Sequence, residues 1–255
     1  MEIVLMIGVA ILAGLLAGRL ALALSVQTLG PESEANLLRQ LRWPALRLTL
    51  IDIASAAAWV MVLWRFGHNI EGLVVLTLVF ALTALSLVDL YSYRLPDRLI
   101  FRGLGVTALL MLVGALRSGD FAGIQFAAIG MCGYCGFLLL VHLLSPRGLG
   151  FGDVKLALLL GQHLGWLAGI NGGDASMVVG LIFWTQVLAS LGGLVTGVTV
   201  ALLRSTVNQR MLADPQRSSA NPKRLLAQSF PFGPVLAVAT LMVMLFVGVA
   251  TDSTL

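Results

Sequence analysis

The chain has 255 residues, of which 58% are hydrophobic and only 11% are charged. Soluble globular domains carry about 25% charged residues, so this composition excludes an ordinary soluble domain. The net charge of +4 does not indicate a nucleic-acid partner, since an excess of Lys and Arg in a helical membrane protein reports its topology.

Eight apolar runs follow one another along the chain, most of them long enough to cross a bilayer as a helix. They are continuous rather than alternating, which favours helices over a closed barrel. The first run follows Met1-Glu2 without a positively charged start, so we expect a retained span rather than a signal peptide. The expected spans are 3–25, 46–65, 70–90, 99–116, 121–144, 154–170, 175–203 and 233–251. The sequence thus predicts an all-α, polytopic membrane protein of about eight transmembrane helices, forming one domain over residues 1–255.

Basic residues alternate between the connections of these runs. The odd-numbered connections, with their flanking helix ends, hold 13 of the 16 Lys and Arg residues, whereas the even-numbered ones hold two. By the positive-inside rule the odd connections face the cytoplasm and both termini face outward. Two of these connections, at about 26–45 and 205–230, are expected to be polar cytoplasmic loops.

Several polar side chains within the spans need an explanation, because ionisable groups in a membrane are costly. We expect Asp52 to pair with a nearby basic group. Arg19 could pair with Asp52, bind a lipid phosphate or extend to the interface, and the sequence leaves these open. Cys132 and Cys135 are expected to pack within the fifth span, and the three histidines show no metal-ligand spacing. The sequence therefore predicts no metal site.

Two further aspartates occupy special positions. Asp89 ends an apolar run a few residues before Pro96, which cannot continue a helix, so it is predicted near a helix C-terminus. Asp153 follows Gly150 and Gly152 and begins the sixth run, near a helix N-terminus. The predicted topology brings both carboxylates to the cytoplasmic face at similar depth. Asp97, beside Pro96, is expected to cap the fourth span.

Facing carboxylates support acid–base chemistry, because like charges at close range cannot both ionise. The ionised member can activate a water molecule while the protonated member polarises a carbonyl. A helix N-terminus favours an anion and a C-terminus disfavours it, so Asp153 is expected to be the ionised partner and Asp89 the proton carrier. For Asp153 alone, a purely structural helix cap is the alternative.

Three segments resemble the signatures of bacterial type IV prepilin peptidases, which are membrane aspartyl proteases of the Gly-x-Gly-Asp type. They are Asp89 with Leu95-Pro96-Asp97, the run from Gly150 to Leu156, and the run from Phe230 to Ala237. The resemblance covers roughly residues 70–240. It implies that Asp89 and Asp153 are the catalytic pair.

The resemblance also implies an active-site motif that includes Gly150, Gly152, Lys155 and Pro96, although Lys155 could equally mark the membrane boundary. It implies cleavage of the basic leader of prepilins or pseudopilins at the cytoplasmic face of the bacterial inner membrane, without a cofactor. Many family members also methylate the new N-terminus with S-adenosylmethionine and carry a zinc domain with paired Cys-x-x-Cys motifs. Residues 26–45 contain no Cys, so methyl transfer here stays open.

Three other readings remain. Intramembrane carboxylates also mark ion pathways in transporters, but those lie near the bilayer midplane rather than at helix ends. Proteases of the presenilin and signal-peptide-peptidase type share Gly-x-Gly-Asp, but they pair it with Tyr-Asp, where this chain has Val88-Asp89. A catalytically silent membrane scaffold is the third. The membrane lipid is a partner in every reading.

Overall fold

The computed structural model describes residues 2–28, 44–92, 96–146, 149–212 and 232–248. Its helices follow the eight expected spans one by one. Their bounds are α1 Glu2–Thr28, α3 Pro44–Phe66, α4 Ile70–Ser92, α5 Asp97–Ser118, α6 Ala122–Leu144, α7 Phe151–Ile170, α8 Ala175–Leu212 and α9 Gly233–Val247. The prediction of an all-helical protein is therefore confirmed.

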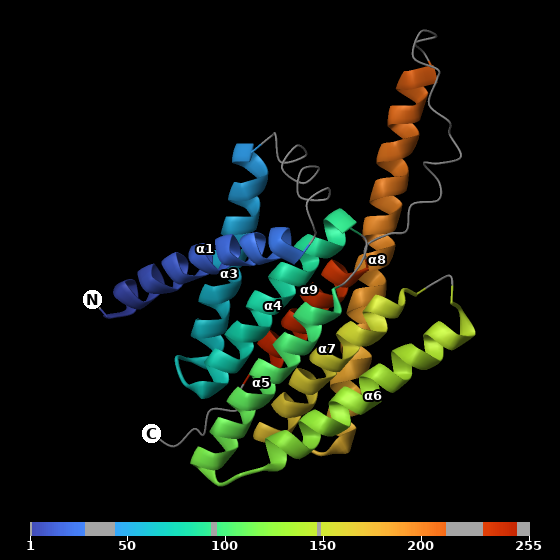
Figure 1. Ribbon diagram of the computed structural model, residues 1–255. Coiled ribbons are helices and arrows are strands. Elements are labelled where there is room, and N and C mark those ends of the chain that lie inside the picture. The colour runs from blue at the N-terminus through green and yellow to red at the C-terminus, as the bar shows by residue number, and fades with distance from the viewer. Residues whose placement is uncertain (1, 29–43, 93–95, 147–148, 213–231, 249–255) are drawn as a thin grey trace.

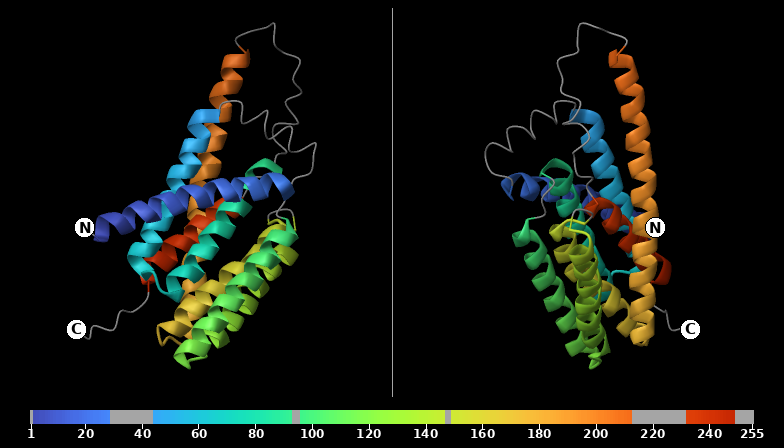
Figure 2. Two further views of the ribbon diagram at one scale, coloured as in Figure 1. Left: turned by 60° about the vertical axis from the view of Figure 1, so that its left-hand side comes forward. Right: turned by 90° about the vertical axis from the view of Figure 1, so that its right-hand side faces the viewer.

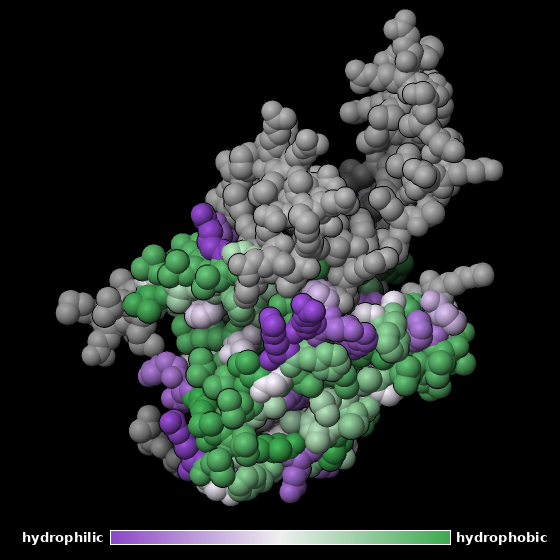
Figure 3. Space-filling model, viewed as in Figure 1, coloured by the Kyte–Doolittle hydropathy of each residue, from purple (hydrophilic) through white to green (hydrophobic). Residues whose placement is uncertain are grey.

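Four helices, α4, α5, α6 and α8, contain stretches long and apolar enough to cross a membrane. Their outward side chains include large exposed hydrophobic residues, and the face over α5 and α6 is largely hydrophobic (Figure 3). Exposed apolar surface of this extent, on helices long enough to span a bilayer, is typical of a membrane-facing surface. The structure thus agrees with a multi-pass membrane protein.

The helices form a bundle in which successive members run in opposite directions (Figures 1 and 2). The C-terminal ends of α4, α6 and α8 and the N-terminal ends of α5, α7 and α9 point to the same end of the bundle. These are the ends that adjoin the basic, odd-numbered connections of the sequence. We call this end the aspartate end, because it carries Asp89 and Asp153.

Two helices differ from the expectation. α1 runs across the bundle rather than along it and packs on α3 and α4 (Figure 1). α8 continues to Leu212, so residues 205–212 are helical, although a loop was expected over 205–230. At 1.5 Å per residue its 38 residues are about 57 Å long, well beyond a bilayer core of about 30 Å. The rest of that loop, and most of the one expected at 26–45, lie outside the described residues.

α7 is the central helix, and α6 packs along it more closely than along any other partner. Glycines at four-residue spacing make this approach possible. A Cβ at Gly161 would overlap the carbonyl oxygen of Gly130, one at Gly165 that of Phe126, and one at Gly169 would lie 2.6 Å from Cα of Gly123. Small residues in such a row let helix backbones approach directly, the usual way membrane helices associate.

Polar side chains in the interior bind one another or the backbone. The hydroxyl of Thr107 on α5 lies 3.1 Å from Oε1 of Gln162 on α7, and the Tyr134 hydroxyl donates to Gln186 over 3.3 Å. The ring of His163 is fully buried, with Nδ1 2.7 Å from the carbonyl oxygen of Leu159 one turn earlier. These bonds reduce the cost of burying polar groups in an apolar bundle.

Candidate active site

Two buried carboxylates meet at the aspartate end. Asp89 lies three residues before the end of α4 and is 5% exposed, while Asp153 lies in the first turn of α7 and is 7% exposed. Helices α4 and α7 both pack against α5 and α9, which places Asp89 near enough to act electrostatically on Asp153. The structure therefore brings together two residues that stand 64 positions apart in the sequence.

The glycines before Asp153 explain how its carboxylate is held. Gly150 is the N-cap residue of α7, which makes Asp153 the third residue of the helix. A Cβ at Gly150 would lie 3.4 Å from Oδ2 of Asp153, and the backbone amide of Gly150 interacts with that carboxylate. This is the acidic half of a capping box, in which the third helical residue reaches back to the N-cap amide. Asp153 is thus not an N-cap residue itself.

Asp89 faces a second helix N-terminus that the sequence reasoning missed. Gly233, the first residue of α9, directs its backbone amide to the Asp89 carboxylate, and a Cβ there would lie 2.8 Å from Oδ2. Oδ2 is buried and accepts no hydrogen bond from the described residues. The positive end of a helix dipole thus acts on both aspartates. The helix-terminus asymmetry expected between them is therefore reduced, and their protonation order stays a prediction.

The signal for this contact was present in the segment from Phe230 to Ala237. Its Gly233-Pro234 pair combines a residue that permits close approach with one suited to the first turn of a helix. A pattern in a single sequence does not tell which buried group such a helix terminus will contact.

A salt bridge joins the segment that follows Asp153 to the segment that follows Asp89. Lys155 Nζ on α7 lies 2.7 Å from both carboxylate oxygens of Asp97 at the start of α5, and 5.2 Å from the centre of the Phe151 ring. Lys155 is thus engaged by Asp97 rather than by the aspartate pair. Pro96 is the N-cap residue of α5, so the expectation that Asp97 caps this helix is wrong. As an acidic residue in the first turn, Asp97 still interacts favourably with the helix dipole.

Arg19 and Asp52 pair with each other away from this site. Nη2 of Arg19 on α1 lies 2.9 Å from Oδ2 of Asp52 on α3, which confirms the expected basic partner of Asp52. Ser55 on α3 donates to the carbonyl oxygen of Gly14 over 2.8 Å, which fixes the same crossing of α1 over α3.

His142 on α6 borders the segment that leads to Asp153, since its Nδ1 lies 2.8 Å from the carbonyl oxygen of Leu149 and its ring centre 5.7 Å from that of Phe151. Cys132 and Cys135 are free thiols on α6, one exposed and one half-buried. Over the described part of the chain, no three His, Cys, Asp or Glu side chains converge as metal ligands do.

The family comparison agrees with this geometry. The model of the type IV leader peptidase family matches residues 76–206, just over half of the chain and including both aspartates. This protein belongs to the type IV leader peptidase family. As a member of that family it resembles proteins named prepilin leader peptidase/N-methyltransferase. No solved structure shows a significant match.

Three such relatives indicate the extent of the likeness. The protein from Pseudomonas putida is 29% identical over 196 residues, which cover 76% of this chain and 57% of the relative. The one from Pseudomonas aeruginosa is 29% identical over 200 residues, covering 76% and 56%. The one from Burkholderia pseudomallei is 36% identical over 129 residues, covering 48% and 40%. This leader peptidase family member thus spans less than two thirds of their length.

Proposed function

We propose that this protein is an aspartyl endopeptidase that removes the leader of prepilins or pseudopilins, with Asp89 and Asp153 as its catalytic pair. The observation that carries the proposal is the meeting of two buried, electrostatically interacting carboxylates within the segment that matches the family. The printed names of the relatives supply the substrate class.

The chemistry follows from the proximity of the two groups. Two neighbouring carboxylates resist ionising together, because ionising both places like charges side by side, so the pair is expected to carry one proton. The ionised aspartate removes a proton from a water molecule, whose oxygen attacks the scissile carbonyl carbon. The protonated aspartate donates its proton to the carbonyl oxygen, which gives a tetrahedral diol intermediate. The aspartate that took the proton from water then passes it to the leaving nitrogen, the other aspartate takes back a proton from a hydroxyl of the diol, and the C–N bond breaks. Such a pair titrates jointly, so its pH–rate profile has two coupled ionisations.

The membrane arrangement supports a cytoplasmic active site in the inner membrane. The basic connections adjoin the aspartate end of the bundle, and the positive-inside rule assigns such connections to the cytoplasm. A substrate with a basic leader would keep that leader on the same side. Its apolar segment would lie against the lipid-facing helices.

Methyl transfer is a separate matter, although the relatives' names include it. S-adenosylmethionine carries an amino group, a carboxylate and a sulfonium, so a site for it needs free ionic partners. Arg19 on α1 and Asp52 on α3 bind each other, which leaves neither free for such a ligand. We therefore derive no methyl-transfer step, and the mass of the product N-terminus tests for one.

The test is cleavage of prepilins and pseudopilins in membranes that contain the protein, followed by gel mobility and N-terminal sequencing. Asp89→Asn and Asp153→Asn keep the side-chain shape but remove the ionisable group, and each should lower the rate by about 1,000-fold or more.

Asp174→Asn is the matched control. Its carboxylate lies in the α7–α8 turn, where the hydroxyl of Ser176 and the amide of Met177 bind it and hold its pKa below the ordinary range. It should cleave at the wild-type rate. Cleavage that persists in Asp89→Asn or Asp153→Asn at equal protein levels would contradict the two-aspartate mechanism. Proton flux in proteoliposomes that depends on Asp89, without any cleavage, would favour a transporter.

A further inference from the structure

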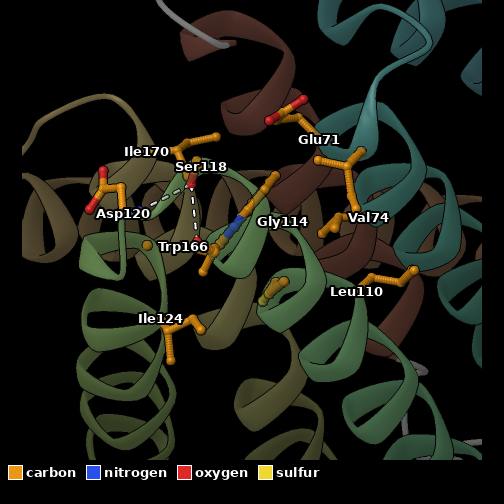
Figure 4. A pocket seen from close by; sticks show the side chains of 13 residues that line it. Glu71, Val74, Leu110, Gly114, Ser118, Asp120, Ile124, Trp166 and Ile170 are labelled. Atoms are coloured by element: carbon orange, nitrogen blue, oxygen red, sulfur yellow. Dashed lines mark hydrogen bonds between the residues drawn. The ribbon is translucent and has the colours of Figure 1, made fainter.

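A cavity of about 170 Å³ lies at the end of the bundle opposite the aspartates (Figure 4). Helices α4, α5, α6 and α7 line it, together with the turn between α5 and α6. Its walls are mostly apolar and include Leu110 and Ile124. Two glycines keep it open, since Gly114 leaves a gap beside Ile70 and Gly123 leaves the edge of the Trp166 indole uncovered.

Polar side chains of Glu71, Asp120 and Trp166 line this cavity, together with Ser118, whose hydroxyl already binds the carbonyl oxygen of Ala115 and the amide of Asp120. Glu71 in the first turn of α4 and Asp120 in the α5–α6 turn bring carboxylates to its rim. Glu71 has no ion-pair or hydrogen-bond partner among the described residues. Asp120 uses Oδ1 to accept from the amide of Ala122, which leaves its other oxygen for a ligand.

The third group is the indole of Trp166. The residue is 4% exposed and lines the cavity, yet its N–H donates to no acceptor in the part of the chain that the structure describes. A buried indole usually finds a partner. The cavity therefore presents two carboxylates and one N–H donor, which together suit a ligand that carries a cationic amine beside a hydrogen-bond acceptor.

We propose that this cavity binds the head group of an aminophospholipid, phosphatidylethanolamine. Its primary ammonium would pair with Glu71 and Asp120, and its phosphate oxygen would accept from the N–H of Trp166. The acyl chains would continue over exposed apolar side chains that neighbour lining residues in the sequence, Leu116 and Phe121. An anionic head group lacks the ammonium and would meet two carboxylates of like charge.

The position of the cavity links lipid binding to the aspartate site. α4 begins at the cavity with Ile70 and Glu71 and ends at Asp89, while α7 begins at Asp153 and reaches the cavity with Trp166. Between these ends α5 packs against both helices, and a Cβ at Gly103 would contact Ala81 of α4 on one side and Leu159 of α7 on the other. A bound head group would join their far ends directly.

The test measures lipid retention on the purified full chain by native mass spectrometry. The protein is mixed with equal amounts of phosphatidylethanolamine, phosphatidylglycerol and phosphatidylcholine of the same acyl chains. We expect one retained phosphatidylethanolamine, favoured over phosphatidylglycerol by about tenfold or more, as charge-assisted hydrogen bonds allow. Equal retention of the three lipids would overturn the proposal.

Variants assign the binding to this cavity. Glu71→Gln with Asp120→Asn should reduce the preference for phosphatidylethanolamine at least about tenfold, and Trp166→Phe should reduce it severalfold. Asp174→Asn and Trp184→Phe remove a carboxylate and an indole outside the cavity and should retain it. Retention of the preference in the Glu71 and Asp120 double variant would refute the proposal.

A second measurement guards against misfolding. Phosphatidylethanolamine should raise the melting temperature of the wild type and of both controls but not of the double variant. Gly114→Leu, which fills the cavity, should lose the same lipid-dependent rise while keeping its monodisperse elution. A lipid-dependent rise equal to that of the wild type in Gly114→Leu would equally contradict binding here. None of these outcomes depends on peptidase activity.

Discussion

Gly165→Ala should separate α6 from α7 and lower the stability of the bundle. A Cβ at this position would overlap the carbonyl oxygen of Phe126 and lie 3.1 Å from Cα of Ala127. Both neighbours belong to a helix backbone, so no side-chain rotation can relieve the overlap and the helices must move. Overpacking costs about 1–3 kcal/mol, and a backbone clash belongs at the upper end. Helix propensity returns about 1 kcal/mol for Gly→Ala, so we expect a net loss of about 2 kcal/mol.

The assay is thermal unfolding in detergent at a fixed scan rate, followed by circular dichroism. A loss of about 2 kcal/mol should lower the melting temperature by about 4–8 °C for a chain of this size. Gly180→Ala is the matched control, since no atom lies within 4 Å of its Cβ position on α8. It should melt at or above the wild-type temperature. A Gly165→Ala variant that melts as high as Gly180→Ala would refute the packing argument.

Two more predictions concern polar contacts between helices. Arg65 donates to the carbonyl oxygens of Leu245 and Val247 at the C-terminal end of α9, so Arg65→Leu should destabilise the protein by about 2 kcal/mol in the same melting assay. An unchanged melting temperature would show that these bonds contribute nothing. Lys155→Gln breaks the partly exposed pair with Asp97, so it should cost less than about 1 kcal/mol and reduce cleavage only severalfold. A loss as large as that in Asp89→Asn would instead assign Lys155 to the catalytic machinery.

The sequence was sufficient to predict the helices and the end of the bundle at which both aspartates lie. Long apolar runs separated by polar connections determine where the helices lie, and the alternation of basic residues determines which ends lie together. These two patterns place Asp89 and Asp153 at one end of the bundle, and the prediction requires no information about how the helices pack. The pairing of Asp52 with Arg19 could be expected for a different reason, because a buried carboxylate requires a partner.

Contacts between helices were harder to predict. Apolar residues cover most faces of these helices, so little hydrophobic periodicity remains to indicate which face is buried. The crossing of α1 over α3, which depends on the close approach at Gly14, has no clear pattern in the sequence. The row of Gly161, Gly165 and Gly169 did carry a signal, namely the four-residue spacing typical of close membrane helix pairs. Gly192 and Gly193 on α8 likewise permit a close approach, here of the side chains of Val235 and Phe232 at the start of α9.

The approach of Gly233 to Asp89 leads to the sharpest test of the aspartate site. A methyl group at Gly233 would lie 2.8 Å from Oδ2 of Asp89, so Gly233→Ala should displace the carboxylate while α9 remains helical. A displacement of about 1 Å at a reacting group can cost about 100-fold in rate. We therefore expect kcat to fall by about 100-fold with little change in KM or melting temperature, whereas Gly180→Ala should keep the wild-type kcat. If Gly233→Ala cleaved prepilin at the wild-type rate, the tight contact between α9 and Asp89 would have no part in the reaction, and the chemistry would have to rest on Asp153 with a different partner.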